Sequence, residues 1–124
     1  FMISGTVVEG KAIGRTLQYP TANLKPSEDY KLIPKNGVYV VEATINSKQV
    51  FGITSVGTIP TVGGTQKTIE THFLDFDQNL YNQQLQIEFI THIRDEETFD
   101  GVETLKEAIK QDELFARNFI KTRE

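Results

Sequence analysis

Cysteine is absent from the 124-residue sequence, and histidine occurs only as His72 and His92. The absence of cysteine excludes disulfides, thiolate zinc sites, iron–sulfur ligation and cysteine nucleophiles, and it suits a reducing compartment. Two histidines are too few for a histidine-rich metal cluster. Metal and redox chemistry that depends on cysteine is therefore excluded.

Positive charge is also scarce, because 13 Lys and Arg face 17 Asp and Glu, which gives a net charge of −4. Nonspecific attraction to nucleic acid or anionic lipid has no electrostatic support at this charge. No apolar run approaches the roughly 18 residues of a membrane span, and the start FMISGTVVEG lacks the features of a signal peptide. We therefore expect a soluble, cytoplasmic domain with no nucleic-acid partner and no membrane partner.

The length and composition predict a single folded domain over residues 1–124. Apolar residues make up 38% and charged residues 24%, with 8 Phe and 4 Tyr, which is unlike a disordered or low-complexity chain. A chain of this size buries roughly two-thirds of its unfolded surface. A core can form without disulfides or a structural metal.

The first three-quarters of the chain predict short β-strands, because β-branched and aromatic runs alternate with Gly, Pro and Asn clusters. In the last strand-like run, Leu85, Ile87, Phe89 and Ile93 share one face. Asn46-Ser47 has the composition of a hairpin turn. The strand segments are Ile3–Val8, Val38–Ile45, Gln49–Thr54 and Gln84–Ile93.

The last quarter changes to apolar spacings of three and four, which predicts an α-helix over about residues 101–121. Asp100 and Glu103 resemble a capping box at its start, and Arg117, Lys121 and Arg123 complement the negative end of its dipole. The apolar stripe consists of Val102, Leu105, Ala108, Ile109, Phe115, Ala116, Phe119 and Ile120.

Several short strands followed by one covering helix predict an all-β fold with one C-terminal α-helix, in which the sheet closes into an antiparallel barrel and leaves no exposed edge. Two stretches, Gly10–Lys35 and Val56–Thr65, are longer than a small barrel needs for connections. We expect both to be functional loops.

Thr21 and Asn23 are the first candidate site residues. They follow Pro20 and lie two apart, so on a strand they face the same way. Hydroxyl and amide oxygens suit Mg²⁺, which takes its other ligands from water and substrate phosphates. On spacing alone, a polar turn is the favoured interpretation.

Glu70 is the second candidate. Alternation places Thr68, Glu70 and His72 opposite the apolar face of their strand. A carboxylate held on a strand can act as a general base toward a substrate hydroxyl. A solvated charge is the commoner role of a strand glutamate.

Together these pieces resemble the riboflavin kinase family. The matching segments, in family order, are ISGTVVEGKAIGR from Ile3, PTAN at Pro20–Asn23, NGVYVV at Asn36–Val41, VGTIPT at Val56–Thr61, ETHFLDFD at Glu70–Asp77 and IRDEETFD at Ile93–Asp100. They cover nearly the whole chain. The resemblance implies a six-stranded antiparallel Greek-key β-barrel with a C-terminal helix.

The resemblance also implies ATP-dependent phosphorylation of the riboflavin 5′-hydroxyl, giving FMN and ADP. Carried over by motif, Thr21 and Asn23 hold Mg²⁺ and nucleotide phosphate, and Glu70 accepts the proton of the attacking hydroxyl. Gly10 and Arg15 belong to a flap over the nucleotide.

On the same resemblance, Tyr81 lies near the adenine, and Arg94 and Phe99 lie by the flavin. In many bacteria this module is the C-terminal half of a bifunctional FAD synthetase whose N-terminal half is an FMN adenylyltransferase. That half is absent from this chain, so we expect an excised domain or a standalone kinase. A non-catalytic flavin-binding barrel is the alternative, although it would need neither a metal pair nor a base.

Four positions depart from the family's usual letters. Gln18 and Asn82 stand where Gly is common, and Ser55 and Ile59 replace an Asn and an Arg. None is a proposed metal or base position, so these changes bear on loop conformation and affinity rather than on the type of reaction.

Overall fold

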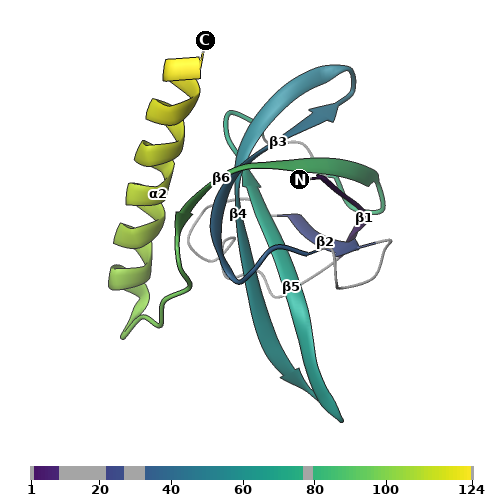
Figure 1. Ribbon diagram of the computed structural model, residues 1–124, viewed down its shortest axis with the longest axis vertical. Coiled ribbons are helices and arrows are strands. Elements are labelled where there is room, and N and C mark those ends of the chain that lie inside the picture. The colour runs from purple at the N-terminus through teal and green to yellow at the C-terminus, as the bar shows by residue number, and fades with distance from the viewer. Residues whose placement is uncertain (1, 9–21, 27–32, 77–79, 124) are drawn as a thin grey trace.

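The computed structural model describes residues 2–8, 22–26, 33–76 and 80–123. Six antiparallel strands close into a barrel, and one helix packs against its side (Figure 1). Barrel, strand directions and helix confirm the predicted fold class. The strands are β1 (Met2–Val8), β2 (Ala22–Pro26), β3 (Gly37–Ile45), β4 (Lys48–Thr61), β5 (Gly64–Phe73) and β6 (Gln84–Arg94), and the helix is α2 (Val102–Arg123).

The strand order around the barrel is β1-β2-β5-β4-β3-β6, and β6 pairs with β1 to close it. Strands β3, β4 and β5 are joined as successive hairpins, while β2 lies beside β5. A Greek key consists of three consecutive antiparallel strands and a fourth strand, adjacent in the chain to one end of the three, that pairs with the strand at the other end. Here β3, β4 and β5 are the three strands and β2 is the fourth, since it precedes β3 in the chain but pairs with β5. The predicted Greek-key topology is therefore confirmed.

The barrel interior holds the larger apolar cluster, which confirms the predicted apolar face of β5. Tyr39, Val41, Ile69 and Phe73 all belong to it. Gly5 of β1 lies close to the backbone of β2, because a Cβ at this position would be 2.5 Å from the Lys25 carbonyl oxygen. Only glycine allows β1 and β2 to approach this closely.

A second apolar cluster lies between the outside of the barrel and α2. It contains Val38, Val40 and Ile53 from the sheet, and Ala116 of the helix is fully buried against them. The predicted apolar stripe is only partly correct, because Val102 is 58% exposed and Phe115 44% exposed. The helix touches the barrel mainly along its second half, so its first turn and one flank of the stripe stay in solvent.

The helix begins one position later than the predicted cap implied. Its first hydrogen bond runs from the Leu105 N–H to the Gly101 carbonyl at 3.2 Å, so Gly101 rather than Asp100 holds the N-cap position. Glu103 lies in the first turn, where an acidic side chain complements the helix dipole.

The β3–β4 hairpin has the predicted two-residue turn. Ile45 pairs with Lys48, and Asn46 and Ser47 between them have φ values of 52° and 66°. Two positive φ values are typical of the turn type whose twist matches the flanking strands.

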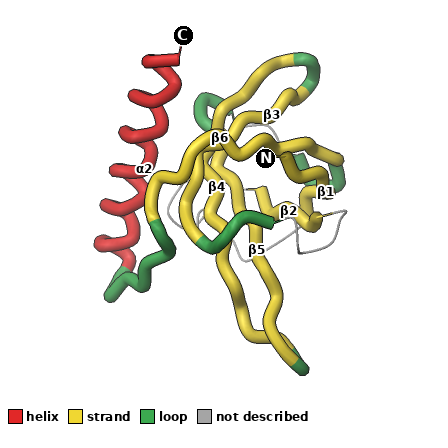
Figure 2. Tube along the Cα trace, in the orientation of Figure 1, coloured by secondary structure: helices red, strands yellow, loops and turns green. Residues whose placement is uncertain are grey.

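The expectation of a functional loop over Val56–Thr65 is wrong. Strands β4 and β5 stay paired from Gly52↔Phe73 to Thr61↔Gly64, with Val62 and Gly63 between the last pair. The pair projects beyond the barrel as a two-stranded ribbon (Figure 2). Glycine and proline reduce strand propensity locally, but continuous cross-strand pairing outweighs this preference.

The predicted face of Ile93 is also wrong. Leu85, Ile87 and Phe89 point into the barrel, whereas Ile93 packs against the cluster under α2. The register between β3 and β6 shifts twice along this stretch, and each bulge reverses the faces that follow. Among the described residues, no helix is long and apolar enough to cross a membrane.

Candidate active site

Five strands bring one predicted catalytic, one predicted metal and one predicted flavin residue into a single cross-strand row. Asn23 of β2 pairs with Glu70 of β5, which pairs with Ser55 of β4. Ser55 pairs with Val38 of β3, which pairs with Arg94 of β6. Directly opposed residues in antiparallel strands share a face. Because Val38 packs under α2, this face is the outside of the barrel.

Glu70 and Asn23 occupy the end of the row away from the helix. Both are half-buried, and within the described part of the chain β2 pairs with β5 at Ala22↔Thr71 and Asn23↔Glu70. The amide oxygen and the carboxylate therefore share the outer face on adjacent strands. Asn23 and Glu70 are two of the three residues that the family resemblance assigned to Mg²⁺ binding and proton transfer; the third is Thr21.

Behind Glu70, a buried hydroxyl pair fixes the strand. The Oγ1 atoms of Thr54 and Thr71 lie 2.6 Å apart, and both residues are 0% exposed. Each hydroxyl satisfies the other in a place that water does not reach. The pair joins β4 to β5 directly beside the Glu70 position.

His72 lies two residues beyond Glu70 on the same outer face, opposite Ile53. Burial lowers the pKa of its imidazole, while Glu113 of α2 acts to raise it and Arg117 to lower it. Burial therefore favours the uncharged form of the ring.

Arg94 forms the other end of the row and is held by the helix. Its Nε and Nη2 atoms each donate to a separate carboxylate oxygen of Asp112 at 2.9 Å. The Asp112 side chain is 6% exposed and that of Arg94 22%. The hydrogen bond to Asp112 raises the pKa of Arg94 above its usual value.

Phe99 lies against this ion pair. Its ring centroid is 5.5 Å from the Arg94 Cζ atom, within the range of a cation–π contact. Phe99 belongs to the connection from β6 to α2. Both predicted flavin-side residues are therefore in contact with one another.

The same connection also touches the ribbon. A Cβ at Gly57 of β4 would lie 2.8 Å from a carboxylate oxygen of Glu96 and 3.1 Å from the Thr68 hydroxyl. A side chain at position 57 would push Glu96 away. The glycine therefore allows the β6–α2 connection to approach β4 and β5 closely.

Tyr81 lies at the Asn23 end of the site. It precedes Asn82, whose N–H donates to the Val7 carbonyl at 2.9 Å, and the next residue of β1, Val8, pairs with Asn23. Asn82 has a φ of 70°. This conformation explains the departure noted from the sequence, because asparagine tolerates left-handed backbone better than other residues with a side chain.

Three predicted site residues, Gly10, Arg15 and Thr21, lie outside the described residues. Within the ranges 2–8, 22–26, 33–76 and 80–123, no group of three or more His, Cys, Asp or Glu could hold a metal ion.

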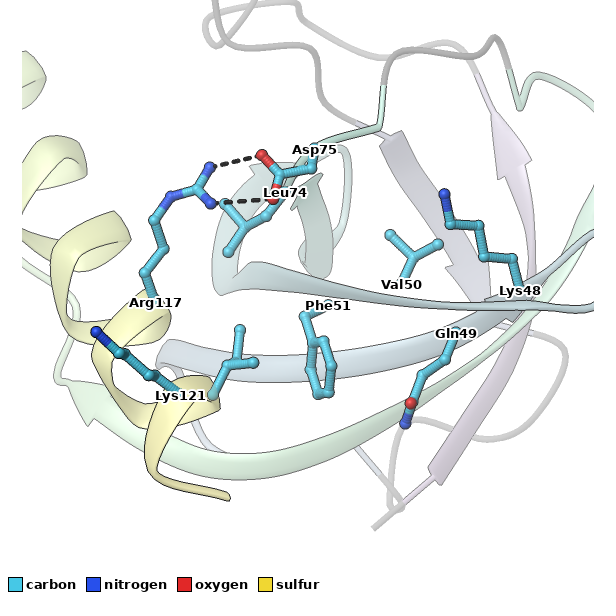
Figure 3. Close-up of a pocket in the computed structure, with 9 residues that line it drawn as sticks. Lys48, Gln49, Val50, Phe51, Leu74, Asp75, Arg117 and Lys121 are labelled. Carbon is cyan, nitrogen blue, oxygen red and sulfur yellow. Dashed lines mark hydrogen bonds and ion pairs between the residues drawn. The ribbon is translucent and has the colours of Figure 1, made fainter. Parts of the chain in front are cut away.

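A cleft of about 340 Å³ lies between α2, the start of β4 and the end of β5 (Figure 3). Arg117 points from the helix to Asp75 and donates to its two carboxylate oxygens at 3.0 and 3.1 Å. None of the nine residues that line the cleft is a predicted site residue. The cleft is therefore distinct from the row of Asn23, Glu70 and Arg94.

Comparison with known proteins decides the family. The family model for riboflavin kinase, or flavokinase, matches residues 1–120. The chain belongs to the riboflavin kinase family. This confirms the resemblance drawn from PTAN, ETHFLDFD and the other segments, and the domain is a kinase domain by family.

Relatives of this riboflavin kinase domain are longer proteins. It is 40% identical over 120 residues to the bifunctional riboflavin kinase/FMN adenylyltransferase of Escherichia coli strain K12, covering 96% of this chain and 38% of that protein. It is 41% identical over 113 residues to the RNA-binding riboflavin kinase of Bacillus subtilis strain 168, covering 90% and 47%.

A solved structure shares the fold. A Streptococcus pneumoniae protein, described as a macrolide-efflux protein, matches with a TM-score of 0.87 and 37% identity over 94% of this chain and 38% of that one. The chain thus spans less than half the length of each of these three proteins.

Asp112 is the residue of this site that sequence reasoning missed. One signal was present, since Asp112 lies three residues after Ile109 and four before Ala116, within the apolar stripe. Nothing in the sequence pairs it with Arg94, which lies 18 residues earlier.

Proposed function

We propose that this chain transfers the γ-phosphoryl group of ATP to the 5′-hydroxyl of riboflavin, giving FMN and ADP. The cross-strand row from Asn23 and Glu70 to Arg94 supports this function. Arg94 and Glu70 are three strands apart, about 14 Å at the usual strand spacing. A tricyclic ring that carries a five-carbon chain has a length of this order. The ring would lie by Phe99 and the reacting hydroxyl by Glu70.

Glu70 is proposed as the general base. The hydroxyl oxygen attacks the γ-phosphorus, the bond from that phosphorus to the bridging oxygen of ADP breaks, and the hydroxyl proton passes to the Glu70 carboxylate. The strand fixes the direction of this carboxylate, and the Thr54–Thr71 pair fixes the strand. Phosphoryl transfer depends chiefly on positioning and charge neutralisation, so a base adds a modest share of the rate.

Thr21 and Asn23 are proposed to hold Mg²⁺. The observation that fits this assignment is the placement of the Asn23 amide on the outer face beside Glu70, because hard oxygen donors suit this ion. When bound, Mg²⁺ neutralises phosphate charge. Gly10, Arg15 and Tyr81 are proposed to contact the nucleotide.

The test is conversion of riboflavin to FMN by the pure chain with ATP and Mg²⁺, followed by chromatography. Glu70→Gln keeps the shape and removes the proton acceptor. General-base assistance is typically worth 10² to 10⁴ in rate, and we expect a loss near the lower bound, about 10² in kcat. Glu88→Gln changes another half-buried strand glutamate outside the row and serves as the matched control.

A Glu70→Gln variant that retains more than about a third of wild-type kcat would contradict the base assignment. Riboflavin binding without FMN formation by the wild-type chain would instead favour the flavin-carrier alternative.

The FMN adenylyltransferase activity of the bifunctional relatives is proposed to lie outside this chain. All the proposed residues belong to one phosphoryl-transfer site, so we expect FMN without FAD. Stoichiometric FAD from the pure chain would refute this. Because one relative is named RNA-binding, a gel-shift measurement with RNA accompanies the assay, and the net charge of −4 predicts no shift.

A further inference from the structure

We propose that Asp112 is a positioning residue for the flavin: it sets riboflavin affinity by holding Arg94, and through Arg94 the ring of Phe99, in one orientation. The proposal rests on the proposed function, since it assigns a task to the flavin end of that site.

The first step is the geometry of the ion pair. Two parallel hydrogen bonds of 2.9 Å join the Arg94 guanidinium to the Asp112 carboxylate. A two-point contact of this kind fixes the plane of the guanidinium as well as its position. Both side chains are largely buried, at 22% and 6% exposed, so solvent competes little for these bonds.

The second step is what Arg94 still offers to a ligand. Nε and Nη2 are used by Asp112, and Nη1 is directed to the Asp95 carbonyl oxygen at 3.4 Å. The guanidinium carbon lies over the Phe99 ring, 5.5 Å from its centroid. Arg94 therefore acts here as a support for an aromatic ring rather than as a charged ligand. Aromatic rings pack well against one another in stacked or edge-to-face geometry, so the supported Phe99 ring suits an uncharged tricyclic flavin ring.

The third step is the position of Phe99 in the chain. It lies in the connection between the end of β6 at Arg94 and the start of α2 at Val102. This connection has no regular secondary structure to hold it. The ion pair ties its first residue to the middle of α2, and Glu96 packs over Gly57. Loss of the Asp112 carboxylate would free Arg94 to leave the Phe99 ring.

The helix supplies a matched control. Arg117 forms a second two-point ion pair with a carboxylate, that of Asp75, but its partner's side chain is 77% exposed and its own 42%. Arg117 is on the same helix, and the pair lies at the cleft shown in Figure 3, whose lining does not include Phe99. Asp75→Asn removes one charge from an ion pair of the same type without touching the flavin end.

The experiment compares wild type, Asp112→Asn and Asp75→Asn in riboflavin binding and in steady-state kinetics. A lost hydrogen-bonded charge at a buried site predicts a rise of about tenfold in the riboflavin Kd and KM of Asp112→Asn. The KM for ATP and kcat should stay within about twofold. Asp75→Asn should keep wild-type values for both substrates. Arg94→Lys retains the charge but not the fork, and should behave like Asp112→Asn.

Removal of one partner from a buried ion pair can unfold a small domain. The double variant Arg94→Met/Asp112→Leu removes both charges and fills the space with apolar side chains, which usually preserves the fold. We expect it to melt near the wild-type temperature but to keep the weakened riboflavin binding. Wild-type riboflavin affinity in this folded double variant would refute the positioning role.

The two hypotheses can fail separately. A wild-type chain that makes FMN, together with an Asp112→Asn variant of unchanged riboflavin KM, overturns the role of Asp112 and leaves the kinase function standing. A wild-type chain that neither binds riboflavin nor makes FMN overturns both.

Discussion

The buried hydroxyl pair beside the proposed base allows a stability prediction with a definite sign. Thr54 and Thr71 are each 0% exposed, and their Oγ1 atoms lie 2.6 Å apart. Thr71→Val keeps the branched shape but deletes one hydroxyl. The Thr54 hydroxyl is then left in a dry site without the contact that satisfied it.

An unsatisfied buried polar group costs about 1–3 kcal/mol, whereas replacement of both partners by apolar groups of the same shape is nearly neutral. For a domain of this size, each kcal/mol corresponds to roughly 4 °C in Tm. Thr71→Val should therefore lower Tm by about 4–12 °C, and Thr54→Val should do the same. The double variant should recover most of this loss.

The assay is thermal and urea unfolding of wild type, both single variants and the double variant, analysed as a double-mutant cycle. Because Thr71 points into the barrel and Glu70 points out, FMN formation below the melting transition should change little. If the two losses simply add in the double variant, the hydroxyls do not satisfy one another and the interpretation fails.

Three further outcomes are expected. Asn82→Ala should lower the free energy of unfolding by about 1 kcal/mol, while Asn82→Gly should not, because φ is 70° at this position; equal Tm values for the two variants would contradict this. Burial lowers the pKa of His72 below its unfolded value, so the unfolded chain binds more protons and stability should fall as the pH drops below about 6.5; His72→Gln should show a flatter pH profile in thermal melts. Asn23→Ala should need more Mg²⁺ for half-maximal FMN formation at nearly constant Tm, and an unaltered Mg²⁺ titration would return Asn23 to a structural role.

Local pattern alone predicted the helix, five of the six described strands and most of their faces. Strand β2 (Ala22–Pro26) was missed, because it lies in the stretch Gly10–Lys35 that was expected to be a loop. Alternation in Val38–Ile45 and in the strand of Glu70 follows from the two-residue repeat of a strand, which reports directly which side chains point inward. The helix was predicted to within two residues at each end because its three- and four-residue spacings are equally local. The family could be predicted from sequence motifs, since PTAN and ETH occur along the chain in the order typical of the family.

Only the tertiary structure decided which distant residues meet. Val56–Thr65 forms a paired ribbon, and Ile93 lies on the outer face. Both outcomes depend on cross-strand register and bulges, which cannot be predicted from the composition of one strand. The cross-strand row from Asn23 to Arg94 and the ion pair between Asp112 and Arg94 form because closure of the barrel brings separate strands and the helix together. Periodicity describes how a segment is turned, whereas contacts between segments depend on packing that the whole chain satisfies at once.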